Sequence, residues 1–258
     1  MTIQREAAVG PPVRAVLVHG GVTAGQETWQ AQQPLAARYQ LVTPDRQGYA
    51  VDAPDGRDDP ESDAATIGGL LGDGAHLVGY SMGGLVAMLA ASRNPTAVLS
   101  LVLVEPVAFD LVRGRPDAEE FIQAYDGLRS STEDPEAFLR SFLVFFGADA
   151  DEVAGIPDPM PEPMRKAAVA QFTGVAPWDV RTPVRELAAA RLPIVVVSGG
   201  HSEMLDAICD SLAELVGARR VTIAGAGHAA QFTGAPFNSL LEQTWSAAAS
   251  ADGALARR

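Results

Sequence analysis

The sequence predicts an α/β fold: a doubly wound, mostly parallel sheet with helices on both faces and an inserted helical lid. Three observations support this prediction. Short apolar runs alternate with helix-like stretches through most of the 258 residues. The runs are apolar almost throughout, which is typical of strands that are buried on both faces of a parallel sheet. One long segment, residues 107–190, interrupts the alternation and contains no convincing strand.

Six runs rich in leucine and β-branched residues are expected to form the strands, and four stretches between or after them to form helices. Alternation of this kind predicts right-handed crossovers between parallel strands. The first of the four helices is expected to begin at Ser62, a good N-cap residue. The predicted strands are 15–18, 40–43, 76–79, 98–104, 193–198 and 220–224, and the predicted helices are 62–71, 83–92, 202–216 and 237–249.

The interruption divides the chain into a core, residues 1–106 and 191–258, and an insertion, residues 107–190. Three helices are expected within the insertion, at 117–128, 135–146 and 163–172. The stretch 155–163 holds four prolines and is not expected to be regular. An insertion over the carboxyl ends of parallel strands is a natural lid for an active site. A packing subdomain with no gating role is the alternative.

The charge balance argues against two classes of partner. The chain has 32 acidic and 19 basic residues, a formal charge of −13, which argues against binding to nucleic acid or to an anionic membrane. The single cysteine, Cys209, excludes an internal disulfide and is expected to pack within a helix. Residues 1–10 lack the apolar segment of a signal peptide, and no apolar run reaches the roughly 20 residues of a spanning helix. A cytoplasmic location is therefore predicted.

The segment 76–84 carries the strongest functional signal. Its apolar run leads into Gly79-Tyr80-Ser81-Met82-Gly83, where a serine stands between two glycines at a predicted strand-to-helix junction. A nucleophile elbow needs tiny residues two before and two after the serine, because the turn is tight. The alternative interpretation is a glycine-rich turn that binds a phosphate or nothing.

A serine hydroxyl needs a base to accept its proton, and His228 is the favoured candidate among four histidines. His228 lies in a glycine-rich loop after the last predicted strand, and this loop returns to the sheet edge where Ser81 is expected. His201 is expected in a loop at the same edge and remains a second candidate. His76 precedes the elbow strand, at its far end, where a structural role is expected.

Two backbone N–H groups are expected to stabilise a developing oxyanion. Gly21 follows the first predicted strand in the loop His19-Gly20-Gly21, and Met82 comes directly after the candidate nucleophile. His19 is expected to shape this loop through hydrogen bonds rather than to carry a proton. An ordinary glycine-rich turn is the alternative for the loop.

The order of four motifs resembles the α/β-hydrolase superfamily, and the resemblance spans nearly the whole chain except the predicted lid. It implies that Ser81 is the nucleophile, that His228 is the base, and that the amides of Gly21 and Met82 bind the oxyanion. It also implies a structural role for the turn around Arg46. Members with an aspartate nucleophile, the haloalkane dehalogenases and epoxide hydrolases, are disfavoured by the serine. The motifs are His19-Gly20-Gly21, Pro44-Asp45-Arg46-Gln47-Gly48-Tyr49, Gly79-Tyr80-Ser81-Met82-Gly83-Gly84 and Gly227-His228.

The acid of the implied triad departs from the superfamily's pattern. Members usually place an aspartate three residues after the glycine that ends the penultimate strand, and counting from Gly199 gives Ser202. Glu105 is the favoured substitute, because a residue at the carboxyl end of a strand is held rigidly at the active edge. Glu203 and the absence of any charged acid are the alternatives. A Glu-Pro step that simply turns the chain into the insertion is the other interpretation of Glu105.

The sequence predicts a serine hydrolase that cleaves an ester, lactone or thioester of a hydrophobic small molecule through an acyl-enzyme, without a cofactor or a metal. Hydrolysis of a carbon–carbon bond, perhydrolysis, and non-catalytic ligand binding on the same scaffold are the alternatives. The oligomeric state is left open. An apolar pocket is expected between the core and the lid, because neutral substrates bind in such pockets. Its aromatic candidates are Trp29, Tyr80, Phe109, Phe142, Phe145, Phe146 and Trp178, of which Trp29, Tyr80, Phe146 and Trp178 are the predicted substrate contacts.

Overall fold

The centre of the protein is a parallel sheet, seen here in a computed structural model that describes residues 12–255. Within these residues the sheet has six strands in the order β2-β1-β3-β4-β5-β6, and every neighbouring pair is parallel. All six predicted strands are confirmed, with ends that differ by at most two residues. The strands are β1 (Arg14–Val18), β2 (Gln40–Val42), β3 (Ala75–Tyr80), β4 (Val98–Val104), β5 (Ile194–Ser198) and β6 (Arg219–Thr222).

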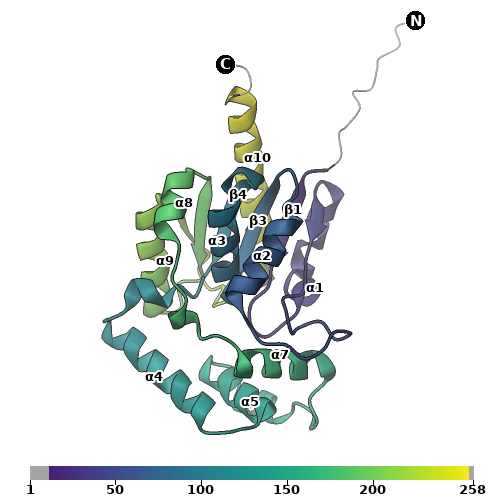
Figure 1. Cartoon of the computed structure of the whole chain (residues 1–258), viewed down its shortest axis with the longest axis vertical. Helices are drawn as coiled ribbons and strands as arrows, with labels where there is room; N and C mark the ends of the chain where they lie inside the picture. Colours follow the sequence, from purple (N-terminus) through teal and green to yellow (C-terminus); the bar gives the residue numbers. More distant parts are fainter. Residues whose placement is uncertain (1–11, 256–258) are drawn as a thin grey trace, which may run out of the picture.

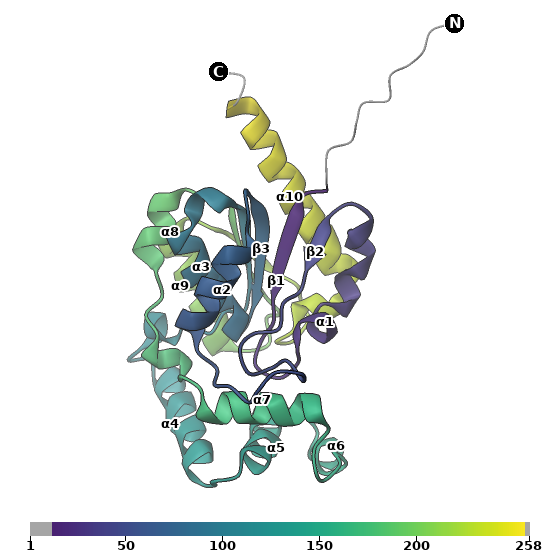
Figure 2. The same cartoon turned by 45° about the vertical axis from the view of Figure 1, so that its right-hand side comes forward.

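Helices cover both faces of the sheet, as predicted (Figures 1 and 2). Successive side chains of a strand point to opposite faces, so Val16 and Val18 belong to one apolar core and Ala15 and Leu17 to another. One face packs against α2 (Pro60–Leu70), α3 (Met82–Arg93), α8 (Val184–Ala190) and α9 (Glu203–Val216). The other packs against the 3₁₀ segment Gln30–Ala37, which follows the short α1 (Gly25–Thr28), and α10 (Ala235–Leu255).

The start of helix α2 differs from the sequence prediction for an identifiable reason. Helix α2 begins at Pro60, because the side chain of Asp59 accepts hydrogen bonds from the N–H groups of Glu61 and Ser62 and so is the N-cap. The predicted start at Ser62 is therefore wrong. Helix α10 extends beyond the predicted 237–249 at both ends. Residues 1–10, which lack a predicted signal peptide, lie outside the described residues.

The segment between β4 and β5 contains four helices that lie beyond the carboxyl ends of the strands, in both views of the molecule (Figures 1 and 2). We call them the outer helices. They share a small apolar core of their own, to which Tyr125, Phe138 and Phe142 belong. Helix α8 follows them and packs on α3 and α9 in the main layer. The outer helices are α4 (Pro116–Ser130), α5 (Pro135–Phe145), α6 (Ala150–Ala154) and α7 (Glu162–Thr173).

The strand order explains where a site can form. From β1 the chain moves to β2 on one side, and it then returns to β3 on the other side of β1. The loops that leave β1 and β3 therefore diverge at the carboxyl edge, where open α/β sheets bind their ligands. Helix α7 lies across this edge (Figure 2). Among the described residues, no helix is both long enough and apolar enough to cross a membrane.

Candidate active site

Ser81 occupies the tight turn between β3 and α3. Its φ of 53° and ψ of −120° lie outside the regions that non-glycine residues ordinarily adopt. A Cβ atom at Gly79 would collide with the carbonyl oxygen of Gly83, and one at Gly83 would collide with the carbonyl oxygen of His19. Both glycines are therefore required, and the turn presents the serine side chain at the carboxyl edge of the sheet.

Ser81, His228 and Glu105 form a continuous chain of hydrogen bonds. His228 Nε2 lies 3.0 Å from Ser81 Oγ, and His228 Nδ1 lies 2.6 Å from Glu105 Oε2. An ionised carboxylate only accepts hydrogen bonds, so Nδ1 carries the proton of the neutral ring. Nε2 is then free to accept the proton of the serine hydroxyl. This is the arrangement that a nucleophile, its base and an orienting acid require.

Glu105 is held in place by two hydrogen bonds to neighbouring backbone. Its backbone N–H donates to Val197 O at 2.9 Å, and its Oε1 accepts the N–H of Gly199 at 2.7 Å. Its φ of 39° is a second left-handed value at a non-glycine residue of the edge. The side chain is only 1% exposed. A carboxylate fixed in this way has little freedom, so its second oxygen is directed at His228.

Ser202, at the usual position of the superfamily's acid, is a helix-capping residue here. Its Oγ accepts the N–H of Leu205 and caps helix α9. Glu203 is exposed in the first turn of the same helix, and no hydrogen bond or ion pair joins it to another described residue. The structure thus brings Glu105, and not Glu203, to His228.

The remaining histidines lie where the sequence places them. His76 is buried at the far end of β3, where its Nδ1 is 2.8 Å from Ser100 Oγ, and burial lowers its pKa to about 4. His201 lies at the carboxyl edge, with its Nδ1 3.4 Å from Glu105 Oε1. Among the described residues, no hydrogen bond or ion pair joins His201 to Ser81. His228 is therefore the histidine that contacts the serine.

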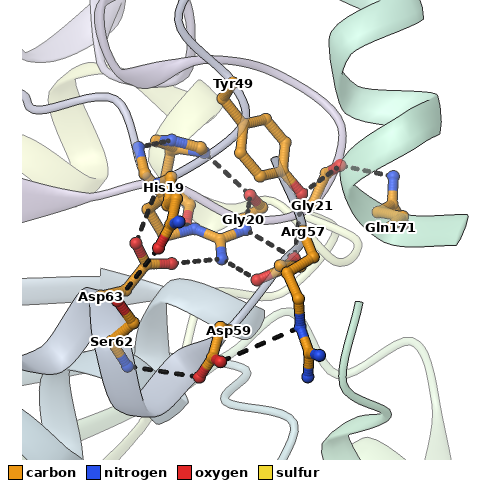
Figure 3. Close-up of polar contacts among 12 residues, drawn as sticks. His19, Gly20, Gly21, Tyr49, Arg57, Asp59, Ser62, Asp63 and Gln171 are labelled. Atoms are coloured by element: carbon orange, nitrogen blue, oxygen red, sulfur yellow. Dashed lines mark hydrogen bonds and ion pairs between the residues drawn. The ribbon is translucent and has the colours of Figure 1, made fainter. Parts of the chain in front are cut away.

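The loop after β1 is held by a buried neutral histidine, His19, which Figure 3 shows, and by a buried arginine, Arg46. The N–H of Arg46 donates to His19 Nε2 at 2.8 Å, and His19 Nδ1 donates to Gly20 O at 2.8 Å. Burial, together with the charge of Arg46, lowers the pKa of His19 well below its usual value. The guanidinium of Arg46 also donates to the carbonyl oxygens of His19 and Gly20, at 3.1 and 2.7 Å. His19 thus shapes the loop through hydrogen bonds, as the sequence predicts.

Two buried carboxylates hold the guanidinium of Arg46. Asp58 accepts from both of its terminal nitrogens, and Asp63 Oδ2 lies 3.2 Å from Nη1. Burial disfavours the charge of Arg46, but the two carboxylates outweigh it and the pKa of Arg46 is raised. Burial raises the pKa of Asp63. Arg46 thus has the expected structural role: it is fixed by two buried ion pairs and holds the carbonyls of the loop after β1 through hydrogen bonds.

The third carbonyl of this loop, that of Gly21, is held from the opposite direction. It accepts a hydrogen bond from Tyr49 Oη at 3.1 Å and another from the side chain of Gln171, a residue of α7 (Figure 3). The sequence reasoning missed Gln171 because no motif marks it. Only its place in an amphipathic stretch of the insertion is visible in the sequence.

The held carbonyls decide where the N–H groups point. In a trans peptide the N–H of Gly21 points opposite to the carbonyl of Gly20, which faces Arg46. Among the described residues, none accepts a hydrogen bond from the N–H of Gly21. The N–H of Met82 begins α3 and has no acceptor within the helix. Both residues line the same cavity as Ser81, so two free donors lie near the serine.

A cavity of about 320 Å³ opens beside Ser81, between the carboxyl edge and the outer helices. Its wall is mainly apolar, with many aromatic side chains, and none of the described residues that line it is lysine or arginine. The polar members of the wall include Thr23, Asp58 and Gln171 besides Ser81 and His228. The aromatic residues are Tyr80, Phe109, Phe121, Tyr125, Phe142, Phe146, Trp178 and Phe232.

The predicted pocket residues divide into two groups. Tyr80, Phe146 and Trp178 line the cavity. The structure corrects the assignment of Trp29, which is fully buried in the core against Phe237, with ring centroids 6.5 Å apart. Phe145, a candidate of the wider set, packs among the outer helices instead. Aromatic residues of the core and of the cavity wall cannot be distinguished in the sequence, because both are buried and neither group has a spacing of its own.

The family model for the alpha/beta hydrolase family matches residues 15–240, from the first strand to the last helix. The chain belongs to this family. An AB hydrolase superfamily protein of Gibberella zeae is 39% identical to the hydrolase over 99 residues, 34% of this chain and 33% of that protein. A dihydrolipoyllysine-residue acetyltransferase component of the acetoin cleaving system, from Cupriavidus necator, is 28% identical over 93% of this chain and 65% of its own length. The chain thus spans less than two thirds of either relative.

Solved structures share the fold of the hydrolase over nearly its full length. A thermophilic esterase from Thermogutta terrifontis is 20% identical, with a TM-score of 0.66 over 91% of each chain. Est816, an N-acyl homoserine lactone degrading enzyme, is 26% identical, with a TM-score of 0.61 over 91% of this chain and 93% of its own.

One group of side chains in the hydrolase has the composition of a metal site. Glu105, His201 and His228 each offer a ligand atom, and these atoms all lie within 4.8 Å of one another. Two of the three also belong to the hydrogen-bonded chain that ends at Ser81. Any ion bound here would therefore compete with that chain.

Proposed function

We propose that this α/β-hydrolase cleaves carboxylic esters, lactones or thioesters of neutral, hydrophobic small molecules through an acyl-enzyme. The observation that carries the proposal is the chain of hydrogen bonds from Glu105 through His228 to Ser81, which ends in an apolar cavity. No metal or cofactor takes part in the steps that follow from it.

The steps follow from the geometry. His228 Nε2 accepts the proton of Ser81 as the serine Oγ attacks the substrate carbonyl, and the carboxylate of Glu105 stabilises the imidazolium that forms. The N–H groups of Gly21 and Met82 donate to the oxyanion. His228 then gives its proton to the leaving alcohol or thiol. In the second half, a water molecule loses a proton to His228 and releases the acyl group from Ser81.

The cavity wall supports a neutral substrate. A substrate carboxylate or phosphate would be buried without a cationic partner among the described lining residues, and it would lie in the same cavity as Asp58. Burial of an unpaired charge costs several kcal/mol or more. An acyl chain or a lactone ring incurs no such cost, and it gains from contact with the aromatic wall. The lactone activity of Est816, at 26% identity, agrees with this class.

The predicted lid, residues 107–190, is part of the proposal. Phe121, Tyr125 and Phe142 reach the cavity from the outer helices, and Phe146 reaches it from the end of α5, so this segment completes the side of the cavity that faces away from the sheet. A cover of this kind keeps water from the acyl-enzyme until the leaving group has departed. The cytoplasmic location stays a prediction.

Substitution of Ser81 tests the proposal directly. Ser81→Ala should abolish hydrolysis of p-nitrophenyl butyrate and labelling by a fluorophosphonate probe, while the circular dichroism spectrum stays unchanged. Ser141→Ala, on the exposed face of α5, is the matched control and should keep both signals. An Ser81→Ala variant that retains wild-type turnover would exclude the mechanism. A wild-type protein that neither turns over esters nor takes up the probe would instead indicate a ligand-binding member of the family.

A further inference from the structure

His201 is the histidine of the carboxyl edge that the proposed mechanism does not use. Its side chain is 37% exposed, and its Nδ1 faces Glu105 Oε1 at 3.4 Å. The other oxygen of Glu105 faces His228 Nδ1 at 2.6 Å. One buried carboxylate thus stands between two imidazole nitrogens, and among the described residues no hydrogen bond holds the side chain of His201.

Two imidazole nitrogens and one carboxylate form a donor set that Zn²⁺ binds well. Tetrahedral ligands at about 2.1 Å from zinc lie about 3.4 Å from one another. The separation between His201 and Glu105, 3.4 Å, already has this value. All three ligand atoms lie within 4.8 Å of one another. Closing a 4.8 Å separation to about 3.4 Å takes a shift of at most about 1.4 Å, which would complete three positions of a tetrahedron, and water would fill the fourth.

Hydrogen bonds to neighbouring backbone fix the orientation of the Glu105 carboxylate. The N–H of Gly199 donates to Glu105 Oε1 at 2.7 Å, and the backbone of Glu105 is tied to Val197. Hydrogen bonds of this kind orient a ligand before a metal binds. The exposed ring of His201 gives an ion access from solvent, while the buried carboxylate lies behind it. The acidic chain, with a formal charge of −13, also attracts cations.

We propose that Glu105, His201 and His228 form a binding site for a divalent transition-metal ion such as Zn²⁺, and that the bound ion reversibly inhibits the hydrolase. The inhibitory part rests on the function proposed above, since the site shares Glu105 and His228 with it. A metal on His228 Nδ1 displaces the proton from that atom. The ring then stays neutral only with its proton on Nε2, and it donates to Ser81 Oγ instead of accepting from it. The serine loses its base.

Metal binding can be measured without any turnover. Calorimetric titration of the Ser81→Ala variant with ZnCl₂, in a buffer that does not chelate metals, should show one site. MgCl₂ should show none, since Mg²⁺ prefers six oxygen ligands. Changes in outer-shell partners alone alter metal affinity by about 10- to 100-fold, so adding His201→Asn to this variant should weaken zinc binding by roughly tenfold or more. Glu203→Gln, an exposed acid two residues away, is the matched control and should bind as before.

Inhibition is the second measurement. ZnCl₂ should slow ester hydrolysis by the wild-type protein, and EDTA should restore it. The concentration for half inhibition, taken relative to each protein's metal-free rate, should rise about tenfold or more in His201→Asn and stay constant in Glu203→Gln. Absence of zinc binding to Ser81→Ala overturns the proposed site, and so does equal binding with and without His201. These titrations need no active enzyme, so they decide the metal site even if the proposed hydrolase activity fails.

Discussion

Replacement of Glu105 by glutamine separates the two candidate acids. The amide oxygen of glutamine can still accept the N–H of Gly199, as Oε1 does at 2.7 Å. This leaves the amide nitrogen facing His228 Nδ1, where the carboxylate oxygen now lies at 2.6 Å. A donor in that place selects the tautomer with the proton on Nε2, which cannot accept the proton of Ser81. The substitution changes the charge and the tautomer while the volume stays the same.

The expected loss can be worked from the charges. Two unit charges with centres roughly 4 Å apart at an effective dielectric constant of about 20 interact by about 4 kcal/mol. The imidazolium of the transition state loses this stabilisation when Glu105 becomes neutral, which corresponds to a rate factor of about 10³. The wrong tautomer adds to the loss, and the same type of change in a serine-protease triad costs about 10⁴. We therefore expect Glu105→Gln to lower kcat by 10³- to 10⁴-fold, about the range these two figures span.

The assay is steady-state hydrolysis of p-nitrophenyl butyrate by Glu105→Gln and by Glu203→Gln, with thermal unfolding to verify that both fold. Glu203 is exposed in the first turn of α9, so its variant should keep kcat within about twofold, as surface substitutions without a buried partner usually do. A larger loss in Glu203→Gln than in Glu105→Gln would refute the assignment of the acid. Wild-type turnover in both variants would show that the histidine works without a charged partner.

Two further predictions concern the loop after β1 and the pH dependence of stability. Gln171→Ala removes one donor to the carbonyl of Gly21 and should lower kcat by about tenfold, the equivalent of one hydrogen bond, with little change in KM. Thr173→Ala, on the same helix and exposed, is its control, and equal effects would mean that Gln171 does not position the loop. Burial lowers the pKa of His76 to about 4, so between pH 6.5 and 4 the unfolded chain binds a proton that the folded chain does not. The contribution of His76 to the free energy of unfolding is therefore complete above about pH 6.5, and the free energy of unfolding should be lower by about 2 kcal/mol at pH 5. Urea unfolding at pH 7 and pH 5 measures this loss, which should shrink in His76→Asn; a loss of the same size in both proteins would contradict it.

Most of the sheet could be predicted from the sequence because its four inner strands, β1, β3, β4 and β5, are buried on both faces. A strand such as β4 is apolar at nearly every position, and this pattern distinguishes it from an amphipathic helix without any knowledge of its neighbours. The start of α2 depended instead on which of several polar residues caps the helix. Asp59 and Ser62 are both good N-cap residues, and the proline at position 60 favours the earlier one.

The proximity of Ser81, Glu105 and His228 could be predicted from the sequence for a related reason. Ser81, Glu105 and His228 each follow a strand, and parallel strands end at the same edge. Position along the chain therefore predicted their proximity in space. Trp29 had no such constraint, because an aromatic side chain in a helical stretch is equally suited to the core and to a cavity wall. Its burial depends on Phe237, a residue at the other end of the chain.

The hydrolase positions its two sets of reacting groups in different ways. The triad candidates depend on strand ends of one sheet, and Glu105 is anchored by the neighbouring strand through Val197. The Gly21 amide depends on a loop whose carbonyls are held by Arg46, Tyr49 and Gln171. Gln171 belongs to an outer helix, so a displacement of α7 would release the Gly21 carbonyl while it left Ser81 and His228 in contact. Under the proposed function, a substrate that contacts both the sheet edge and the outer helices would favour the position of α7 in which Gln171 contacts Gly21. The orientation of the predicted oxyanion donor Gly21 would then depend on occupation of the cavity, whereas the position of Ser81 is fixed by the sheet.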